Sequence, residues 1–94
     1  VAPRALPAAE PVPASTATHD RRAAAAELED TLHRLRLWGR AEITGDRIDV
    51  RSGSCGEPAM RPAIEGARTV LRGAGLTKLR CLEQSGAVVF ARDL

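Results

Sequence analysis

Aromatic residues, histidine and lysine are scarce in this chain. Its 94 residues include no tyrosine and only one tryptophan, Trp38, and one phenylalanine, Phe90. Proteins that bind single-stranded nucleic acid need several aromatic side chains on which bases can stack, and the formal net charge of +2 is too small to indicate a polyanionic partner. The basic residues are almost all arginines interspersed with acidic residues, which is typical of a solvated surface. We therefore expect no nucleic-acid partner.

The chain also lacks a set of residues that could carry catalysis. His19 and His33 are its only histidines, and Cys55 and Cys81 are its only cysteines. A cysteine nucleophile needs a histidine in hydrogen-bonding contact and a third group that orients it, and neither histidine lies near a cysteine in the sequence. A structural zinc site needs four ligands at recognisable spacing, and the sequence contains no CxxC pair. The sequence thus predicts no enzymatic activity, no metal site and no cofactor.

No stretch is long and apolar enough to form a transmembrane helix or the apolar region of a signal peptide. Residues 1–18 are rich in alanine and proline, a composition that buries too little apolar surface to offset the entropy of ordering. We predict a disordered tether over residues 1–18 and one folded domain over residues 19–94. Such a tether is typical of a domain that stands off from a membrane anchor, here upstream of Val1, and no other contact with a membrane is expected.

Two cysteines in a domain of this size favour a disulfide. Domains with small cores often depend on disulfides in oxidising compartments, and we predict a bond between Cys55 and Cys81. Closing the loop of about 27 residues between them would stabilise the domain by about 3–4 kcal/mol through chain entropy. The alternative is a pair of buried free thiols in a cytosolic protein.

The hydrophobic pattern predicts two helices, each followed by a β-hairpin. The predicted helices span residues 20–38 and, from Pro58 or Pro62, residues up to 75; the predicted strands span residues 40–44, 47–51, 76–83 and 87–91. Asp20 can cap the first helix, and Gly39 stands where a helix commonly ends. The first hairpin turns at Gly45-Asp46, a dipeptide suited to a type II′ turn.

This order predicts an α+β fold of two αββ units. Two such units close into a two-layer sandwich in which a four-stranded antiparallel sheet carries both helices on one face. The arrangement is a circular permutation of the ferredoxin-like plait. Its strand order would be third, fourth, second, first, so that residues 40–44 and 76–83 form the edge strands. Lys78, Arg80 and Glu83 partly guard the second of these edges, whereas the first is less guarded.

Three segments carry a resemblance to a known family: GRAEITGDRIDVRSG, LRGAGLTKLRCLE and GAVVFARDL, which end at Gly53, Glu83 and Leu94. From Ala23 onward the chain resembles the inner-membrane platform subunits of bacterial type II secretion and type IV pilus systems. The resemblance implies a periplasmic domain that is tethered to the inner membrane. It also implies a domain that acts in protein transport by contacts with a protein partner of the envelope complex or with a second copy. It rests on the pattern of elements and transfers no functional residue.

Two alternatives remain open. The BON and ring-building domains of periplasmic lipoproteins and type III secretion rings share the order helix, hairpin, helix and strand. A domain that binds an anion or small ligand could instead use the backbone amides of the loop Gly53, Ser54, Cys55 and Gly56, although Glu57 would repel an anion there.

The surface most suited to a protein partner is predicted at the first helix and the first strand. Leu37 and Trp38 would be its apolar anchors, and Ala41 and Ile43 would lie on the adjoining edge strand. A tryptophan at a helix end can equally fill the core, so exposure of Trp38 separates the two possibilities.

Overall fold

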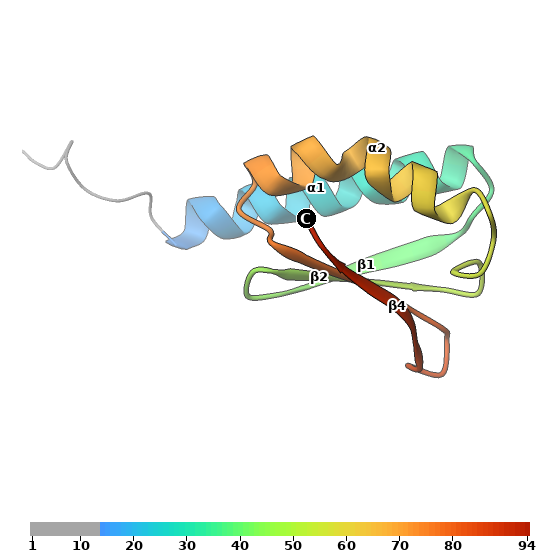
Figure 1. The fold of residues 1–94 in the computed structure, drawn as a ribbon. Coiled ribbons are helices and arrows are strands. Elements are labelled where there is room, and N and C mark those ends of the chain that lie inside the picture. The colour runs from blue at the N-terminus through green and yellow to red at the C-terminus, as the bar shows by residue number, and fades with distance from the viewer. Residues whose placement is uncertain (1–13) are drawn as a thin grey trace, which may run out of the picture.

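A computed structural model describes residues 14–94, in which two helices cover one face of a four-stranded sheet (Figure 1). The elements are α1 (Ala14–Arg34), β1 (Gly39–Thr44), β2 (Arg47–Ser52), α2 (Met60–Gly73), β3 (Lys78–Leu82) and β4 (Val88–Asp93). The predicted α+β class and αββαββ order are confirmed. Residues 1–13, which are most of the predicted tether, lie outside the described residues.

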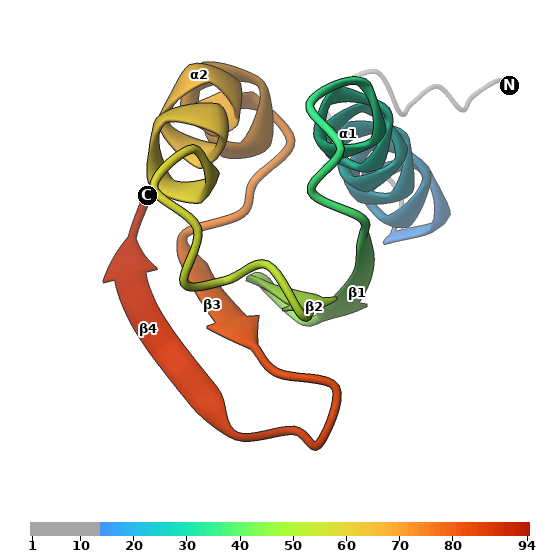
Figure 2. The same ribbon diagram turned by 90° about the vertical axis from the view of Figure 1, so that its right-hand side faces the viewer.

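The sheet is mixed rather than antiparallel. Its strand order is β1-β2-β3-β4, with antiparallel pairs β1/β2 and β3/β4 and a parallel pair β2/β3. The predictions of a fully antiparallel sheet and of the permuted ferredoxin-like strand order are therefore wrong. The edges are β1 and β4, while β3 lies inside the sheet (Figure 2).

The strand that lies beside β2 is what differs. In the predicted order β2 and β3 would also run in the same direction, with β4 between them, whereas here β3 lies directly beside β2. α2 has 14 residues and is therefore about 21 Å long, which is close to the length of a six-residue strand. It returns the chain to the end of the sheet at which β2 begins, so β3 runs beside β2 in the same direction. Arg47 pairs with Lys78, and Val50 pairs with Cys81. The three elements form a βαβ unit, in which parallel strands are joined by a helix.

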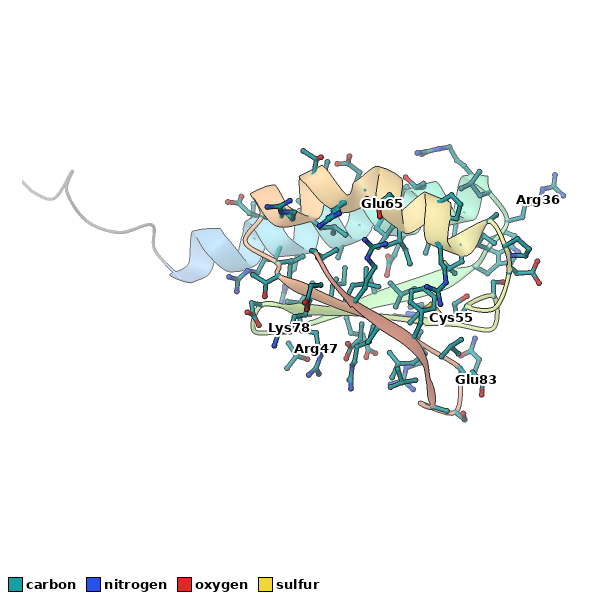
Figure 3. The ribbon with its side chains drawn as sticks, in the orientation of Figure 1. Arg36, Arg47, Cys55, Glu65, Lys78 and Glu83 are labelled. Atoms are coloured by element: carbon teal, nitrogen blue, oxygen red, sulfur yellow. A yellow bond between two sulfur atoms is a disulfide. The ribbon has the colours of Figure 1, made fainter. Side chains whose placement is uncertain are left out.

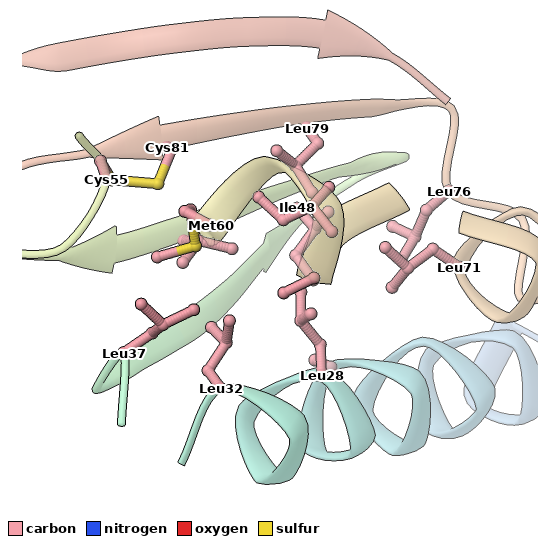
Figure 4. Close-up of a cluster of buried hydrophobic side chains, with 14 of the residues drawn as sticks. Leu28, Leu32, Leu37, Ile48, Cys55, Met60, Leu71, Leu76, Leu79 and Cys81 are labelled. Carbon is pink, nitrogen blue, oxygen red and sulfur yellow. A yellow bond between two sulfur atoms is a disulfide. The ribbon is translucent and has the colours of Figure 1, made fainter. Parts of the chain in front are cut away.

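Cys55 and Cys81 form a disulfide, as predicted, with their Cα atoms 5.8 Å apart. Cys55 lies in the loop after β2, and Cys81 lies near the end of β3. Parallel strands bring their carboxyl ends to the same side of the sheet, so the bond ties together two ends that the βαβ unit has already placed side by side. Both cysteines are buried at the margin of the core (Figure 4).

α1 is displaced along the sequence relative to its prediction. It begins at Ala14, before the expected cap at Asp20, and ends at Arg34 instead of near Trp38. The backbone of residues 14–18, which were assigned to the tether, is thus helical. Alanine is the best helix former, and two alanines stand in this extension while four more follow at residues 23–26.

The end of α1 is a Schellman motif. The Arg36 N–H donates to the carbonyl of His33 at 3.0 Å, and the Leu37 N–H donates to the carbonyl of Leu32 at 2.8 Å. Arg36 has the left-handed φ of 61° that this motif requires. The sequence predicted that Gly39 would take this position at the end of the helix. The hydrophobic contact that accompanies such motifs joins the residues at each end of the longer bond. Here these residues are Leu32 and Leu37, and both are buried in the core.

α2 ends in the same way, but with glycine at the left-handed position. Gly75 has a φ of 90°, and its N–H donates to the carbonyl of Arg72 at 2.9 Å, while the Leu76 N–H donates to the carbonyl of Leu71 at 3.1 Å. Arg36 therefore occupies a site in the first αββ unit that the second unit fills with glycine.

Arg36→Gly is expected to stabilise the domain by about 0.5–1 kcal/mol. A side chain in the left-handed region costs about 1–2 kcal/mol that glycine avoids, and part of this gain is offset by the larger entropy of glycine in the unfolded chain. Urea unfolding would measure the change. Arg34→Gly, two residues earlier and still within α1, should instead destabilise the domain by about 1 kcal/mol, and a loss of stability in both variants would contradict the prediction.

The core lies between the helices and the sheet (Figure 4). Its fully buried side chains are Leu28, Leu32, Ile48, Val50, Met60, Ile64, Leu71, Leu76, Leu79 and Cys81, together with Ser52. Arg21 connects α1 to the rest of the domain outside this core, because its guanidinium donates to the carbonyl of Gly45 at 2.9 Å and to that of Ala74 at 3.3 Å.

Candidate functional site

The four residues predicted to bind a partner do not share one exposed surface. Leu37 belongs to the core and is only 4% exposed, whereas Trp38 is 59% exposed. Ala41 and Ile43 lie on β1, are half-buried and pack against the core. A role for Trp38, Ala41 and Ile43 in binding a partner stays a prediction, and Leu37 has a structural role in the core.

The outer edge of β1 is guarded by α1. A shallow groove between the two elements is lined by Arg22, Ala25, Ala26, Glu29, Ala41 and Ile43. Within it the Glu29 carboxylate accepts a hydrogen bond from the Ala41 N–H at 2.6 Å. An edge strand attracts another strand through its outward N–H and C=O groups, and this contact removes one of them. The expectation that the first strand is the less guarded edge did not anticipate Glu29.

The turn between α1 and β1 presents Trp38 to solvent. Trp38 has a φ of 46°, a second left-handed conformation two residues after that of Arg36, and this turns its side chain outward while Leu37 enters the core. The His33 ring packs edge-to-face against the indole, with 4.8 Å between ring centroids. Leu35 in the same turn is 49% exposed.

Trp38→Ala is expected to leave the domain folded and to change its free energy of unfolding by less than about 0.5 kcal/mol, because the indole is mostly outside the core. Leu37 precedes Trp38 in the chain but is buried. Leu37→Val removes only one methylene and should lower the free energy of unfolding by about 1 kcal/mol. Urea unfolding followed by far-UV circular dichroism measures both variants without relying on tryptophan emission. Unfolding of Trp38→Ala would show that Trp38 holds the fold.

A second feature, a charged cluster, lies on the face of the sheet that the helices leave open. Asp49 on β2 is only 8% exposed and accepts two hydrogen bonds from each of two arginines. Arg80 on β3 donates at 3.0 and 2.9 Å, and Arg47 on β2 donates at 3.0 and 3.2 Å. Bidentate contacts of this kind are among the stronger hydrogen bonds in proteins. One carboxylate between two guanidiniums leaves an excess of positive charge on this face.

The arginines also set the ionisation of the cluster. Hydrogen bonding from Arg80, followed by that from Arg47, lowers the pKa of Asp49 against the opposing effect of burial, and Asp49 in turn raises the pKa of Arg80. Asp49 therefore remains a carboxylate throughout the neutral range. Its partners lie two residues away on the same strand and one strand across, so the cluster braces β2 against β3.

The opposite edge of the sheet, β4, is open. Within the described part of the chain β4 pairs with β3 alone, and α2 contacts only the side chains that β4 turns toward the helices: Arg61 lies over the Phe90 ring at 4.2 Å, and Glu65 pairs with Arg92 at 2.7 Å. Val88 and Val89 at the start of the strand are 49% and 41% exposed. Figure 2 shows β4 at the margin of the sheet, below α2.

The alternation of hydrogen bonds along β4 shows which of its residues direct their backbone N–H and C=O groups away from the sheet. The Leu94 N–H donates to the carbonyl of Thr77 at 2.9 Å, and hydrogen-bonded pairs alternate along an antiparallel ladder. With the observed register, Arg92 and Phe90 point their backbone groups toward β3, so those of Ala91 and Asp93 point away from the sheet. No loop, turn or side chain among the described residues donates to the Ala91 C=O or accepts from its N–H.

A shallow basic groove lies beside this edge on the open face. Its volume is about 420 Å³, and its lining includes Arg47, Lys78, Arg80 and Ala91 together with one acidic residue, Asp93, which lies opposite Lys78 on β4. Figure 3 shows Arg47 and Lys78 on the side of the sheet away from the helices. Lys78 forms no ion pair with a described residue. The predicted strand order, with β3 at an edge and β4 inside the sheet, does not bring these residues together at an edge.

The loop at residues 53–56 serves chiefly to position Cys55. The Ser54 N–H donates to the Ser52 hydroxyl at 2.9 Å, and the Glu57 N–H donates to the Ser54 carbonyl at 2.9 Å. Of the four amides in the loop, that of Ser54 is therefore engaged within the chain, and anion binding by this loop stays a prediction. Residues 14–94 bring together no group of histidine, cysteine, aspartate and glutamate side chains that could hold a metal ion.

None of the helices described is long and apolar enough to cross a membrane. The chain matches no protein-family model, and no curated protein or solved structure is significantly similar to it. The sequence and the geometry of the described residues are therefore the grounds for assigning a function.

Proposed function

We propose that this domain is a non-enzymatic protein-interaction module of the bacterial cell envelope, and that it binds an extended segment of a partner protein along β4. The open β4 edge carries the proposal. An uncovered edge strand offers a row of backbone donors and acceptors to which another strand can add. β1 offers a less complete row, because Glu29 occupies the Ala41 N–H.

The residues around β4 favour a particular kind of segment. The backbone of Ala91 would supply one donor and one acceptor, and Val88 and Val89, exposed in the unbound domain, would contact apolar side chains. Lys78 lies one strand away on the open face and would attract acidic side chains. Main-chain bonds give affinity in this mode of recognition, and the flanking side chains give specificity.

The disulfide supports an oxidising compartment. Disulfides persist in the periplasm and outside the cell, and they are rare in the cytosol. The periplasm, with the domain tethered to the inner membrane, is therefore the location we propose. The αββαββ order that the chain shares with platform subunits of secretion and pilus systems supports a role in such an assembly.

A ring-building domain is a second candidate, and the topology supplies an observation in its favour. The first five elements, from α1 to β3, complete the βαβ unit and its disulfide, and β4 adds to them at an edge. In such an assembly the partner of β4 would be another copy of the chain, and self-association would build the ring.

In-cell photo-crosslinking tests the proposal. A photoreactive benzoylphenylalanine placed at Val88 should yield an adduct in cells that produce the protein natively, whereas the same group at the exposed Thr69 on α2 should not. The mass of the adduct distinguishes a second copy of the chain from another protein. The proposal is wrong if the Val88 position yields no more adduct than the Thr69 position.

A matched pair at Ala91 makes the test specific to strand addition. Ala91→Pro removes the outward N–H without removing a bond to β3, and proline is tolerated at such edge positions. Ala91→Ser keeps the N–H. The adduct at Val88 should therefore fall at least tenfold with proline and persist with serine, and equal yields from the two variants would contradict a backbone contact.

A further inference from the structure

The segment at residues 34–40 combines exposed apolar side chains with exposed arginines. Trp38 is 59% exposed and Leu35 is 49% exposed, and the left-handed backbone at Arg36 and Trp38 holds this shape. Strained conformations at residues other than glycine persist where the surrounding structure enforces them, and they cluster at functional sites. Because the only tryptophan in the chain is mostly exposed, it contributes little to the stability of the fold. A role in binding accounts better for a tryptophan at this position.

Three arginines in this turn have no acidic partner. Arg34, Arg36 and Arg40 form no ion pair with a described residue, and the recorded side-chain bond in this group runs from Arg34 to the Thr31 hydroxyl at 3.1 Å. Arg47, Arg51, Arg68, Arg80 and Arg92 each pair with a carboxylate, whereas Arg21, Arg22, Arg61 and Arg72, spread over the two helices, also form no ion pair with a described residue. Figure 3 shows Arg36 projecting from the end of the molecule. We name Arg34, Leu35, Arg36, Trp38 and Arg40 the Trp38 patch.

We propose that the Trp38 patch docks on an anionic phospholipid surface. Tryptophan prefers the boundary between headgroups and acyl chains, because its ring is apolar and its N–H is polar. Leu35 would enter the same layer, and the guanidiniums would bind lipid phosphates, each contributing about 1 kcal/mol near an anionic surface. Charge complementarity would suit an acidic protein equally, but the exposed Trp38 and Leu35 between the arginines and the projecting position of the turn favour a membrane.

This proposal does not depend on the one for β4. The Trp38 patch adjoins β1, and β4 lies at the opposite edge of the sheet. Binding to lipid through the patch would leave β4 free to bind a protein. It would also give the domain a contact with the membrane other than the anchor expected upstream of Val1.

Vesicles provide a direct test, because Trp38 is the only tryptophan and its emission reports its own surroundings. The full chain is mixed with vesicles of phosphatidylcholine containing about 30% phosphatidylglycerol, and separately with vesicles of phosphatidylcholine alone. Co-sedimentation and a blue shift of Trp38 emission are expected with the anionic vesicles only. Raising the NaCl concentration from about 0.05 to 0.5 M should weaken binding at least tenfold, because salt screens exposed charges.

Matched charge reversals test the location of the contact. Arg36→Glu combined with Arg40→Glu should weaken co-sedimentation at least tenfold, since each basic residue near the surface contributes about 1 kcal/mol. Arg22→Glu combined with Arg72→Glu changes the net charge equally, on arginines that are exposed but lie outside the patch, and should have a much smaller effect. Trp38→Ala, followed by sedimentation, should also weaken binding.

Three outcomes would overturn the proposal. They are equal binding to neutral and anionic vesicles, equal losses in the two double variants, and a shift of Trp38 emission that follows protein concentration in the absence of lipid. The last would assign the patch to self-association. None of these results would affect the crosslinks expected at Val88, so failure here is distinguishable from failure of the β4 proposal.

Discussion

Reduction of the Cys55–Cys81 disulfide is expected to lower the free energy of unfolding by about 3–4 kcal/mol. The bond joins residues 26 positions apart, and chain entropy predicts a stabilisation of this size for such a loop. For a domain of this length the melting temperature should fall by about 15–25 °C. Thermal unfolding with and without a reductant gives the value, and an increase of about 2 Da in intact mass confirms that the bond has been reduced.

The variant Cys55→Ala with Cys81→Ala provides the control. Its stability should agree with that of the reduced wild type to within about 1 kcal/mol, because alanine fills a buried cysteine site with a small loss of packing. Reductant should not affect the variant. A melting temperature that falls by less than about 5 °C on reduction of the wild type would contradict the expected contribution of the bond.

The positions of the same two cysteines favour the observed strand order over the predicted one. Cys55 follows one predicted strand, and Cys81 lies near the end of another. The predicted order would place the carboxyl ends of these strands at the same side of the sheet but with another strand between them, about 10 Å apart. A disulfide, whose Cα atoms here are 5.8 Å apart, favours adjacent strands, and adjacent strands with their carboxyl ends at one side are parallel.

Local sequence signals predicted the elements well where backbone geometry was decisive. Gly45 has a φ of 59°, as a type II′ turn requires at its first central position, and both hairpins form. The end of α1 was misplaced, because Arg36 takes the left-handed position where glycine was expected. The buried contact of Leu37 with the core decides this end, and a rule based on glycine alone does not detect it.

The candidate sites were harder to predict because they depend on pairings between distant residues. Trp38 is exposed because α1 ends at Arg34, before it reaches this residue. The edge of β1 is partly covered because Glu29, twelve residues before Ala41 in the chain, accepts a hydrogen bond from the Ala41 N–H. The open edge at β4 follows from the strand order. The pattern Arg47, Asp49, Arg51 did show alternation on one face of a strand, but the second partner of Asp49, Arg80, comes from another strand.

Asp49→Ala is expected to destabilise the domain by about 2–3 kcal/mol at neutral pH. It leaves Arg47 and Arg80, each with a side chain 33% exposed, facing one another without the carboxylate that they share. Removing one member of a buried pair costs about 3–5 kcal/mol, and the partial exposure of both arginines reduces this figure. Urea unfolding at pH 7 measures the loss.

Glu42→Ala is the matched control, because Glu42 lies on the same open face of the adjacent strand. Its carboxylate is 3.7 Å from Arg51, and its side chain is 59% exposed. Exposed pairs of this kind contribute less than about 1 kcal/mol. If the two variants lost equal stability, the Asp49 cluster would be no more than a surface ion pair.

The pH dependence of this loss identifies its cause. Because Arg80 and Arg47 lower the pKa of Asp49 in the folded state, the stabilising contribution of the carboxylate is fully present above the pKa of the unfolded chain, which is about 4. It is lost as the pH falls below that value through the folded-state pKa. The difference in stability between the wild type and Asp49→Asn should therefore be constant from about pH 5 to pH 8 and shrink below about pH 4. A difference that stays constant down to about pH 2 would show that packing of the side chain, and not its charge, holds β2 to β3.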